Sequence, residues 1–284
     1  MAVDLSTLGT TSDPSDFPVD PDRAKAYAAA TNDDNPAYAG GEYAPPVFAV
    51  VPVFDALGAS AVGLIPAEMA MFIVHGEQDM HFHQPLTPGI TLSSTTTPLS
   101  VRGAGSGTRI TIQTESKDKA TGELVCTQYF TVFVRGLTGA EDGGPDKPGH
   151  DFPEAAREKP LGEPYVVHVD DDQTFRYRDA SGDMMPIHVD ESFAKQVGLP
   201  GIIAHGLCTM AMTSQAVIQR ACGGDPAKLK RLAVRFASNV IPGNDVETQL
   251  YDAGATESGL ASYAFEATSA GAVVIKNGWA EVAS

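Results

Sequence analysis

The chain of 284 residues has few cysteines, few basic residues and no long uninterrupted apolar run. Its three cysteines are odd in number and show no metal-ligand spacing, which argues against a disulfide framework or a cysteine-bound metal. Lys and Arg number 19 against 36 Asp and Glu, and the resulting net charge of −17 argues against nucleic acid as a partner. Every apolar run is interrupted by a charge or a proline before it reaches the length needed to span a membrane, so we expect no membrane partner.

The amino-terminal stretch also lacks the basic and then apolar segments of a secretory signal. Because the cysteines lie in apolar stretches, we interpret them as small buried hydrophobic residues. Both features favour a cytoplasmic protein. Apolar residues make up 43% of the chain, which is sufficient for a buried core.

The sequence contains an internal repeat. Identical residues recur 150 positions apart in one group, which pairs Tyr27, Asp33 and Pro36 with Tyr177, Asp183 and Pro186. They recur 154 positions apart in a second group, which pairs Pro46, Phe82, Pro88 and Gly89 with Pro200, Phe236, Pro242 and Gly243. A constant offset with one short insertion indicates a duplication. The Gly-, Pro- and acid-rich stretch 138–163 then predicts a linker between units at 1–137 and 164–284.

Both copies predict the same order of elements. A short helix begins at Asp20-Pro21 in the first copy and at the acidic run 170–172 in the second. An Asp/Pro turn and a longer apolar helix follow, and the second of these long helices ends before Gly223 and Gly224. Antiparallel strands then flank turns at Lys-Ala-Thr-Gly and Ser-Ala-Gly. A buried helix wrapped by antiparallel strands is an α+β unit, so the fold class is α+β.

The turn of the second copy carries the candidate catalytic pair. Asp183 and His188 lie five residues apart in DMMPIH, with Pro186 between them. Proline keeps the residue before it out of the helical conformation, so the two side chains can converge from a turn. A carboxylate beside an imidazole can activate one water near neutral pH. Each residue alone is explained equally well as a turn cap or a buried structural histidine.

Gly206 is the third candidate catalytic residue. It begins the long apolar helix, where backbone N–H groups are unpaired and carry the positive end of the helix dipole. Glycine lets a ligand oxygen approach the backbone closely, which suits an oxyanion at a polarised carbonyl. The neighbouring His205 is expected at the helix start and Met185 in an apolar wall, and both are candidates for substrate binding. We expect no metal.

These stretches resemble a known motif. YRDASGDMMPIH at 177–188, followed by AHGL, is similar to the hydratase-2 motif of MaoC-like dehydratases, roughly Asp-x-Asn-Pro-x-His after Ser/Thr-Gly. FASNVIPGND at 236–245 resembles the Phe…Pro-Gly-Asp stretch of the same family. The likeness covers both copies and is strongest from 175 to 245.

The resemblance implies a double hot dog, two tandem units that each wrap a sheet around a long helix, as in (R)-specific 2-enoyl-CoA hydratases. It implies syn addition of water to a trans-2-enoyl thioester, giving a (3R)-3-hydroxyacyl product. By position, Asp183 and His188 become the acid/base pair and Gly206 the oxyanion donor. The family needs no cofactor, and its substrate is an acyl-CoA or an acyl carrier protein thioester. A homodimer is expected by family analogy.

Two departures from the motif stand out. The first copy keeps Asp33 but has Tyr38 in place of His188, and Val51 and Pro52 in place of His205 and Gly206. It therefore lacks the imidazole and one N–H, which predicts a degenerate site that serves as acyl-pocket wall. In the second copy, Met185 stands where the family has Asn. A thioether is a poor replacement for an amide that orients a loop or a water.

Met185 and the degenerate first copy keep two alternatives open. One is a non-catalytic acyl-thioester-binding protein or partner subunit, and the other is an acyl-CoA thioesterase. Release of a free thiol separates hydrolysis from hydration. Because the protein is strongly acidic, it needs a local basic patch to bind an anionic carrier. Arg231 and Arg235 in the stretch KLKRLAVRF are the candidates for this patch.

Overall fold

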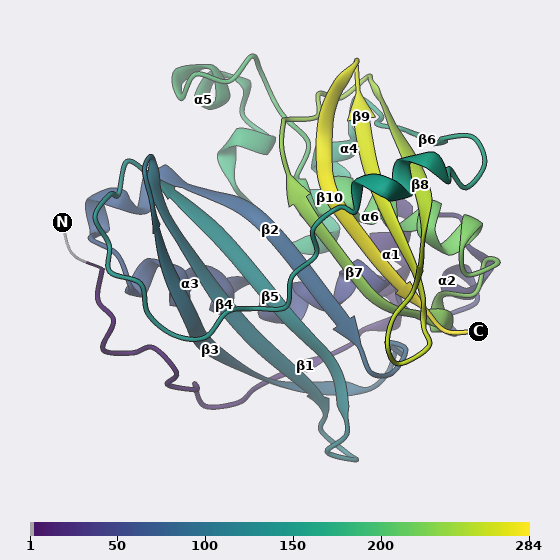
Figure 1. Ribbon diagram of the computed structural model, residues 1–284, viewed down its shortest axis with the longest axis horizontal. Coiled ribbons are helices and arrows are strands. Elements are labelled where there is room, and N and C mark those ends of the chain that lie inside the picture. The colour runs from purple at the N-terminus through teal and green to yellow at the C-terminus, as the bar shows by residue number, and fades with distance from the viewer. Residues whose placement is uncertain (1–2) are drawn as a thin grey trace. The chain divides into compact units, whose positions relative to one another are not determined.

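The structure is a computed structural model that describes residues 3–284, and its contacts divide the chain into two units (Figure 1). Unit 1 comprises Met1–Pro18, Pro52–Gln84 and Ile90–Gly149, and unit 2 comprises Val19–Val51, Pro85–Gly89 and His150–Ser284. This grouping differs from the predicted bounds at 137 and 164. The reason is that the first helix of the amino-terminal copy packs against the matching helix of the second copy.

Unit 1 is built from antiparallel strands and a helix that packs on them. Its strands are β1 (Ser15–Pro18), β2 (Ile73–Phe82), β3 (Thr91–Ala104), β4 (Gly107–Asp118) and β5 (Leu124–Arg135). They are hydrogen-bonded in the order β1-β3-β4-β5-β2 (Figure 1). Helix α3 (Phe54–Gly63) contacts β3 and β4 through a side that buries Leu57 and Ala61, and the short helix η2 (Ala67–Phe72) contacts β5. The predicted strand pair around Lys-Ala-Thr-Gly is confirmed as β4 and β5.

Unit 2 contains a second antiparallel set of strands and the longest helix. Its strands are β6 (Tyr165–His168), β7 (Leu229–Phe236), β8 (Asp245–Ala255), β9 (Ala261–Ser269) and β10 (Ala272–Val282). They are hydrogen-bonded in the order β7-β10-β9-β8-β6. Helix α6 (Gly206–Arg220) contacts β6, β7 and β8. Residues 207–218 are all buried, so the predicted helix wrapped by antiparallel strands is confirmed.

The remaining helices of unit 2 are short. They are α1 (Pro21–Ala30), α2 (Pro36–Ala39), η3 (Glu154–Glu158), α4 (Gln173–Ser181), η4 (Pro186–His188), α5 (Glu191–Gln196) and η5 (Pro226–Lys228). Asp20 caps α1 as predicted, because its carboxylate accepts a hydrogen bond from the Arg23 N–H at 2.7 Å. Asp172 is the N-cap of α4, but its side chain accepts no helix N–H. Its carboxylate pairs with Arg176 at 2.9 Å instead.

Equivalent residues of the two copies make equivalent contacts, which supports the duplication. Gly89 has a φ of 93° and donates its N–H to the Val19 carbonyl at 2.8 Å. Gly243 has a φ of 85° and donates to the Val169 carbonyl at 2.7 Å. A side chain is strained at such a φ, so both Pro-Gly sites require glycine.

The first long helix is less regular than its counterpart. The run Pro46–Gly63 consists of the 3-10 helix η1 (Pro46–Val53) and then α3, because Pro52 lacks the N–H that an α-helix needs. By length and composition alone, this run is apolar enough to cross a membrane, with a mean hydropathy of 1.6. Half of it is buried, and core helices of soluble proteins meet the same criterion.

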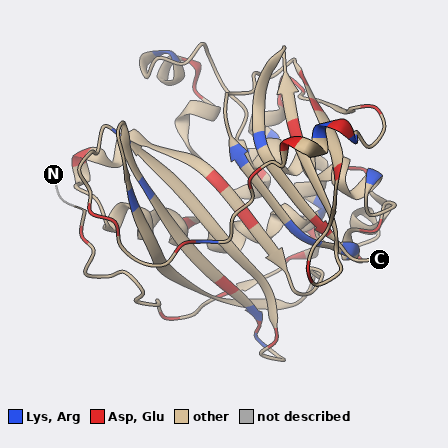
Figure 2. Ribbon diagram, in the orientation of Figure 1, with Lys and Arg blue, Asp and Glu red and all other residues tan. Residues whose placement is uncertain are grey.

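The predicted linker, 138–163, lies along strand edges. Gly143 and Val101 exchange both backbone hydrogen bonds, and Lys159 and Leu161 bond to the backbone of β8. All three cysteines are buried and free, as the sequence predicts. Acidic residues are spread over helices, strands and loops of both units (Figure 2).

Candidate active site

Asp183 follows directly on the end of helix α4. The helix ends at Gly182, whose φ of 88° reverses the chain. The Asp183 N–H donates to Ser181 Oγ, and the Asp183 carboxylate accepts the N–H of Met185, both at 3.1 Å. The first copy repeats this turn, since the Asp33 carboxylate accepts the Asn35 N–H at 3.1 Å. Asp183 is 9% exposed, so the turn fixes a nearly buried carboxylate.

His188 ends η4 and is 7% exposed. Its Nδ1 lies 2.8 Å from the carbonyl oxygen of Ile203. A carbonyl only accepts, so Nδ1 carries the proton and Nε2 of the neutral ring keeps its lone pair. Burial lowers the pKa of His188, against the opposing effects of the Ile203 hydrogen bond and the Asp183 charge. The lowered pKa keeps the ring neutral at pH 7, as a base requires.

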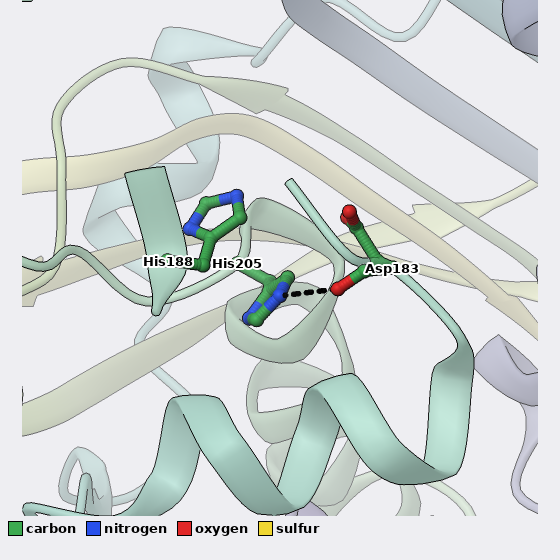
Figure 3. Close-up of side chains that lie close together, drawn as sticks. All are labelled: Asp183, His188 and His205. Carbon is green, nitrogen blue, oxygen red and sulfur yellow. Dashed lines mark hydrogen bonds between the residues drawn. The ribbon is translucent and has the colours of Figure 1, made fainter. Parts of the chain in front are cut away.

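His205 links the other two residues (Figure 3). Its ring stacks on that of His188, with centroids 3.8 Å apart and 28° between the planes. Its Nε2 donates to the backbone carbonyl of Asp183 at 3.3 Å. Burial, and then the neighbouring His188, lower the pKa of His205 to about 3. His205 is therefore a neutral ring that braces both members of the pair, in addition to standing at the start of α6 as predicted.

Gly206 is the first residue of α6, beside His205. Its N–H belongs to the first turn, which has no intrahelical partners. A Cβ at this position would lie 3.3 Å from the ring of Phe236, so the glycine also allows close packing on β7. The structure thus brings Asp183 and His188 of the turn 183–188 together with His205 and the start of α6.

The three polar side chains also resemble a metal site by proximity. One ligand atom from each of Asp183, His188 and His205 lies within 4.8 Å of the others. Two of the four ring nitrogens, however, already donate to backbone carbonyls: Nδ1 of His188 to Ile203 and Nε2 of His205 to Asp183. The geometry favours acid/base chemistry, and the absence of a metal stays a prediction.

The arginines predicted to bind substrate lie on β7. Arg231 is 7% exposed, and its guanidinium pairs with Glu281 of β10 at 3.1 Å. Side chains alternate along a strand, so Arg231 and Arg235 share the face opposite to Phe236, the residue that packs on Gly206. Their role in binding the carrier stays a prediction.

The equivalent place in the first copy is filled by apolar packing. Tyr38, in the position of His188, is 1% exposed and packs with Ala28 and Ile218. Its hydroxyl has no hydrogen-bond partner among the described residues. Asp33 keeps the turn without an imidazole beside it.

Three contributors to the site were not among the predicted site residues. The Ile203 carbonyl sets the tautomer of His188, but a backbone group carries no residue signature. Ser181, which belongs to the Ser-Gly that precedes the motif, holds the Asp183 N–H. Tyr177 lies with its ring centroid 4.8 Å from that of His205 and shares a 3.0 Å hydrogen bond with Tyr27. The tyrosine pair is visible in the sequence through its offset of 150.

Replacement of Met185 by asparagine is expected to stabilise the protein by about 1 kcal/mol, the usual effect of a helix cap. In the first copy Asn35 caps α2, because its Oδ1 accepts the Ala37 N–H at 3.0 Å. Met185 offers no such group, and η4 has no side-chain cap. Urea unfolding of Met185→Asn beside the wild type measures the gain. An unchanged or lowered free energy of unfolding would show that the cap does not form at 185.

Comparison with known proteins agrees with this geometry. Residues 152–269 match the family described as MaoC like domain, and residues 40–136 match the family described as MFE-2 hydratase 2 N-terminal domain. The chain is 31% identical to 3-hydroxyacyl-thioester dehydratase Y of Mycobacterium tuberculosis over 78% of this chain and 74% of that protein. It is also 31% identical to the peroxisomal enoyl-CoA hydratase 2 of Arabidopsis thaliana over 63% of this chain. That match spans 60% of the plant protein, less than two thirds of its length.

Solved structures show the same fold. A MaoC-like dehydratase from Phytophthora capsici superposes with a TM-score of 0.84 and 27% identity over 99% of both chains. A conserved Mycobacterium tuberculosis protein described as a double hotdog fold gives a TM-score of 0.58 and 15% identity over 96% of this chain and 95% of its own. The predicted double hot dog is therefore confirmed, and the chain belongs to the MaoC-like dehydratase family.

Proposed function

We propose that the protein catalyses the (R)-specific hydration of trans-2-enoyl-CoA to (3R)-3-hydroxyacyl-CoA, and the reverse dehydration. The observation that carries the proposal is the proximity of Asp183 to a neutral His188 beside the start of α6, with one polar side-chain atom of each within 4.8 Å of the other. The names of the plant hydratase and the mycobacterial dehydratase support the same chemistry.

The chain's own groups suffice for the reaction. Asp183 and the Nε2 lone pair of His188 hold one water between them, and the pair takes a proton from it as its oxygen bonds to C3. The C2=C3 π bond breaks, and the pair returns a proton to C2 on the same face. No redox step occurs, because water adds as a whole and the thioester stays intact.

Gly206 contributes at the thioester carbonyl. As negative charge develops on that oxygen, the unpaired N–H at the start of α6 donates to it, and the positive end of the helix dipole adds to the effect. Such preorganised donors act only where the charge develops, so they lower the barrier without tightening ground-state binding.

The pH dependence of the rate should reflect the lowered pKa of His188. The base must be neutral, so activity is retained above its pKa and lost as the pH falls through it. Burial moves this pKa below the ordinary value of 6.5 in the free protein, so the acid limb of kcat/KM should lie below pH 6.5. Stopped assays across mildly acidic and neutral pH locate the limb, and a midpoint above 6.5 would contradict the assignment of His188 as the base.

The assay for the function follows two signals in one reaction. Purified protein is mixed with trans-2-enoyl-CoA substrates of increasing chain length, while enoyl absorbance and free thiol are both recorded. Loss of absorbance without thiol release supports hydration, and thiol release identifies a thioesterase. Saturable acyl-CoA binding with neither signal identifies a non-catalytic binding protein.

Several finer features belong to the same proposal. The substrate carrier is CoA or acyl carrier protein, no cofactor takes part, and the protein is a cytoplasmic homodimer without a membrane partner. The Arabidopsis relative is named as peroxisomal, so the cellular location needs its own measurement. Size-exclusion chromatography with light scattering tests the dimer.

A further inference from the structure

The first helices of the two copies, α1 and α4, pack together within unit 2 and exchange equivalent contacts. At the contact, the hydroxyls of Tyr27 and Tyr177 lie 3.0 Å apart. These residues are equivalent in the duplication, at the offset of 150. A contact made on one side of this tyrosine pair is therefore expected to have a counterpart on the other side.

Each helix holds the carboxyl end of the other. Gln173, near the start of α4, donates its amide to the carbonyl of Ala30 at the end of α1. The residue equivalent to Gln173 is Arg23, near the start of α1. It donates from Nε to the carbonyl of Ala180 and from Nη2 to that of Ser181, both at 2.9 Å. At this equivalent position, the end of α4 is thus held by a guanidinium with two hydrogen bonds and the end of α1 by an amide.

The carbonyls that Arg23 holds lie directly before the catalytic turn. Ser181 accepts the N–H of Asp183 on its hydroxyl, and Gly182 between them adopts a φ of 88°. A Cβ at Gly182 would lie 3.2 Å from Nη2 of Arg23, so the guanidinium approaches the turn closely. A cation at the carboxyl end of a helix is also favoured by the helix dipole.

We propose that Arg23 is a positioning residue for Asp183, supplied by the copy that lost its own catalytic residues. The guanidinium fixes the last turn of α4, the turn fixes the backbone of Asp183, and the backbone places the carboxylate opposite His188. The inference rests on the proposed hydratase function for its kinetic consequence. It assigns the first copy a role in catalysis in addition to its predicted role as pocket wall.

The chain offers a matched control in Arg176. Its Nη1 donates to the Ala29 carbonyl and to Asn32 Oδ1, at 3.0 and 3.1 Å, at the end of α1. Arg176→Ala therefore removes the same type of side chain from the end of α1, beside the degenerate Asp33 turn, and it also removes the ion pairs of Arg176 with Asp170 and Asp172. Loss of stability alone is expected to affect both variants, whereas misplacement of Asp183 is expected only in Arg23→Ala.

The kinetic test compares Arg23→Ala, Arg23→Gln and Arg176→Ala with the wild type on trans-2-enoyl-CoA. A misplacement near 1 Å costs about 100-fold in rate. We therefore expect kcat to fall about 10- to 100-fold in Arg23→Ala with KM changed less than about twofold. Arg23→Gln should recover much of kcat, because the equivalent Gln173 reaches the Ala30 carbonyl. A kcat in Arg23→Ala equal to that of Arg176→Ala, or an Arg23→Gln as slow as Arg23→Ala, overturns the proposal.

A titration of the histidines by NMR tests the placement without turnover. The charge of Asp183 raises the pKa of His188, so a displaced Asp183 should lower that pKa further. We expect a lower His188 pKa in Arg23→Ala than in the wild type and in Arg176→Ala. The same pKa in all three proteins overturns the proposal. If the wild type shows no hydration, the proposed function fails, and this titration still decides the role of Arg23.

Discussion

Asp183→Asn and His188→Ala are each expected to lower kcat for enoyl-CoA hydration by roughly 10²- to 10⁴-fold, the usual contribution of general acid/base catalysis. The asparagine keeps the oxygen that accepts the Met185 N–H, so the turn persists while the carboxylate is lost. The alanine removes the Nε2 lone pair. Because the two residues act on one water, the double variant should be little slower than either single variant.

Asp33→Asn is the matched control for this loss. Asp33 makes the same turn in the first copy, with its carboxylate accepting the Asn35 N–H at 3.1 Å, but Tyr38 stands in place of the imidazole. The account predicts an unchanged kcat for Asp33→Asn, measured by the same absorbance assay. Near-normal turnover in Asp183→Asn or His188→Ala would remove the pair from the mechanism.

The same Asp33→Asn substitution is expected to raise the free energy of unfolding by about 1 to 3 kcal/mol at pH 7, because the pKa of the Asp33 carboxyl is raised in the folded protein. Burial, with a smaller effect of the Asp34 charge, raises the pKa of Asp33 to about 6 from its ordinary 3.8. The folded state therefore favours the protonated acid. The cost of ionising Asp33 is absent below pH 3.8, grows between pH 3.8 and about 6 and is complete above that range, so the stabilisation by the neutral amide should grow with pH over the same range.

Urea unfolding of the wild type and Asp33→Asn at pH 4 and pH 7 measures this effect. The gain should be present at pH 7 and nearly absent at pH 4. A variant that is less stable at pH 7, or equally stabilised at both pH values, contradicts the ionisation argument.

The duplication allowed much of the fold and site to be predicted from sequence. The offset of 150 predicted that Asp183 and Asp33 occupy equivalent turns. In the structure both turns contain the same hydrogen bond, from the N–H two residues later to the carboxylate. The apolar spacing of α6 and the glycines after it fixed a helix that proved to be buried along its length. The turn and the helix are each formed by a short stretch of sequence, so each stretch carries its own signal, and the duplication supplies a second copy for comparison.

The rest depends on contacts between distant segments. The predicted unit bounds differ from the observed grouping because α1 packs on α4, which lies about 150 residues away. Arg23 reads as a surface cation in a short helix, and only the fold shows that it meets Ala180 and Ser181. The Ile203 carbonyl, which orients His188, has no residue-type signature. The ion pair between Arg231 and Glu281 likewise joins residues 50 positions apart.

The most direct test of the account is the product formed from trans-2-butenoyl-CoA by the wild type and by Asp183→Asn. The account predicts loss of the enoyl absorbance in the wild type, an intact thioester and a 3-hydroxyl of R configuration, with this conversion nearly absent in Asp183→Asn. An S product, or equal conversion by both proteins, would contradict it.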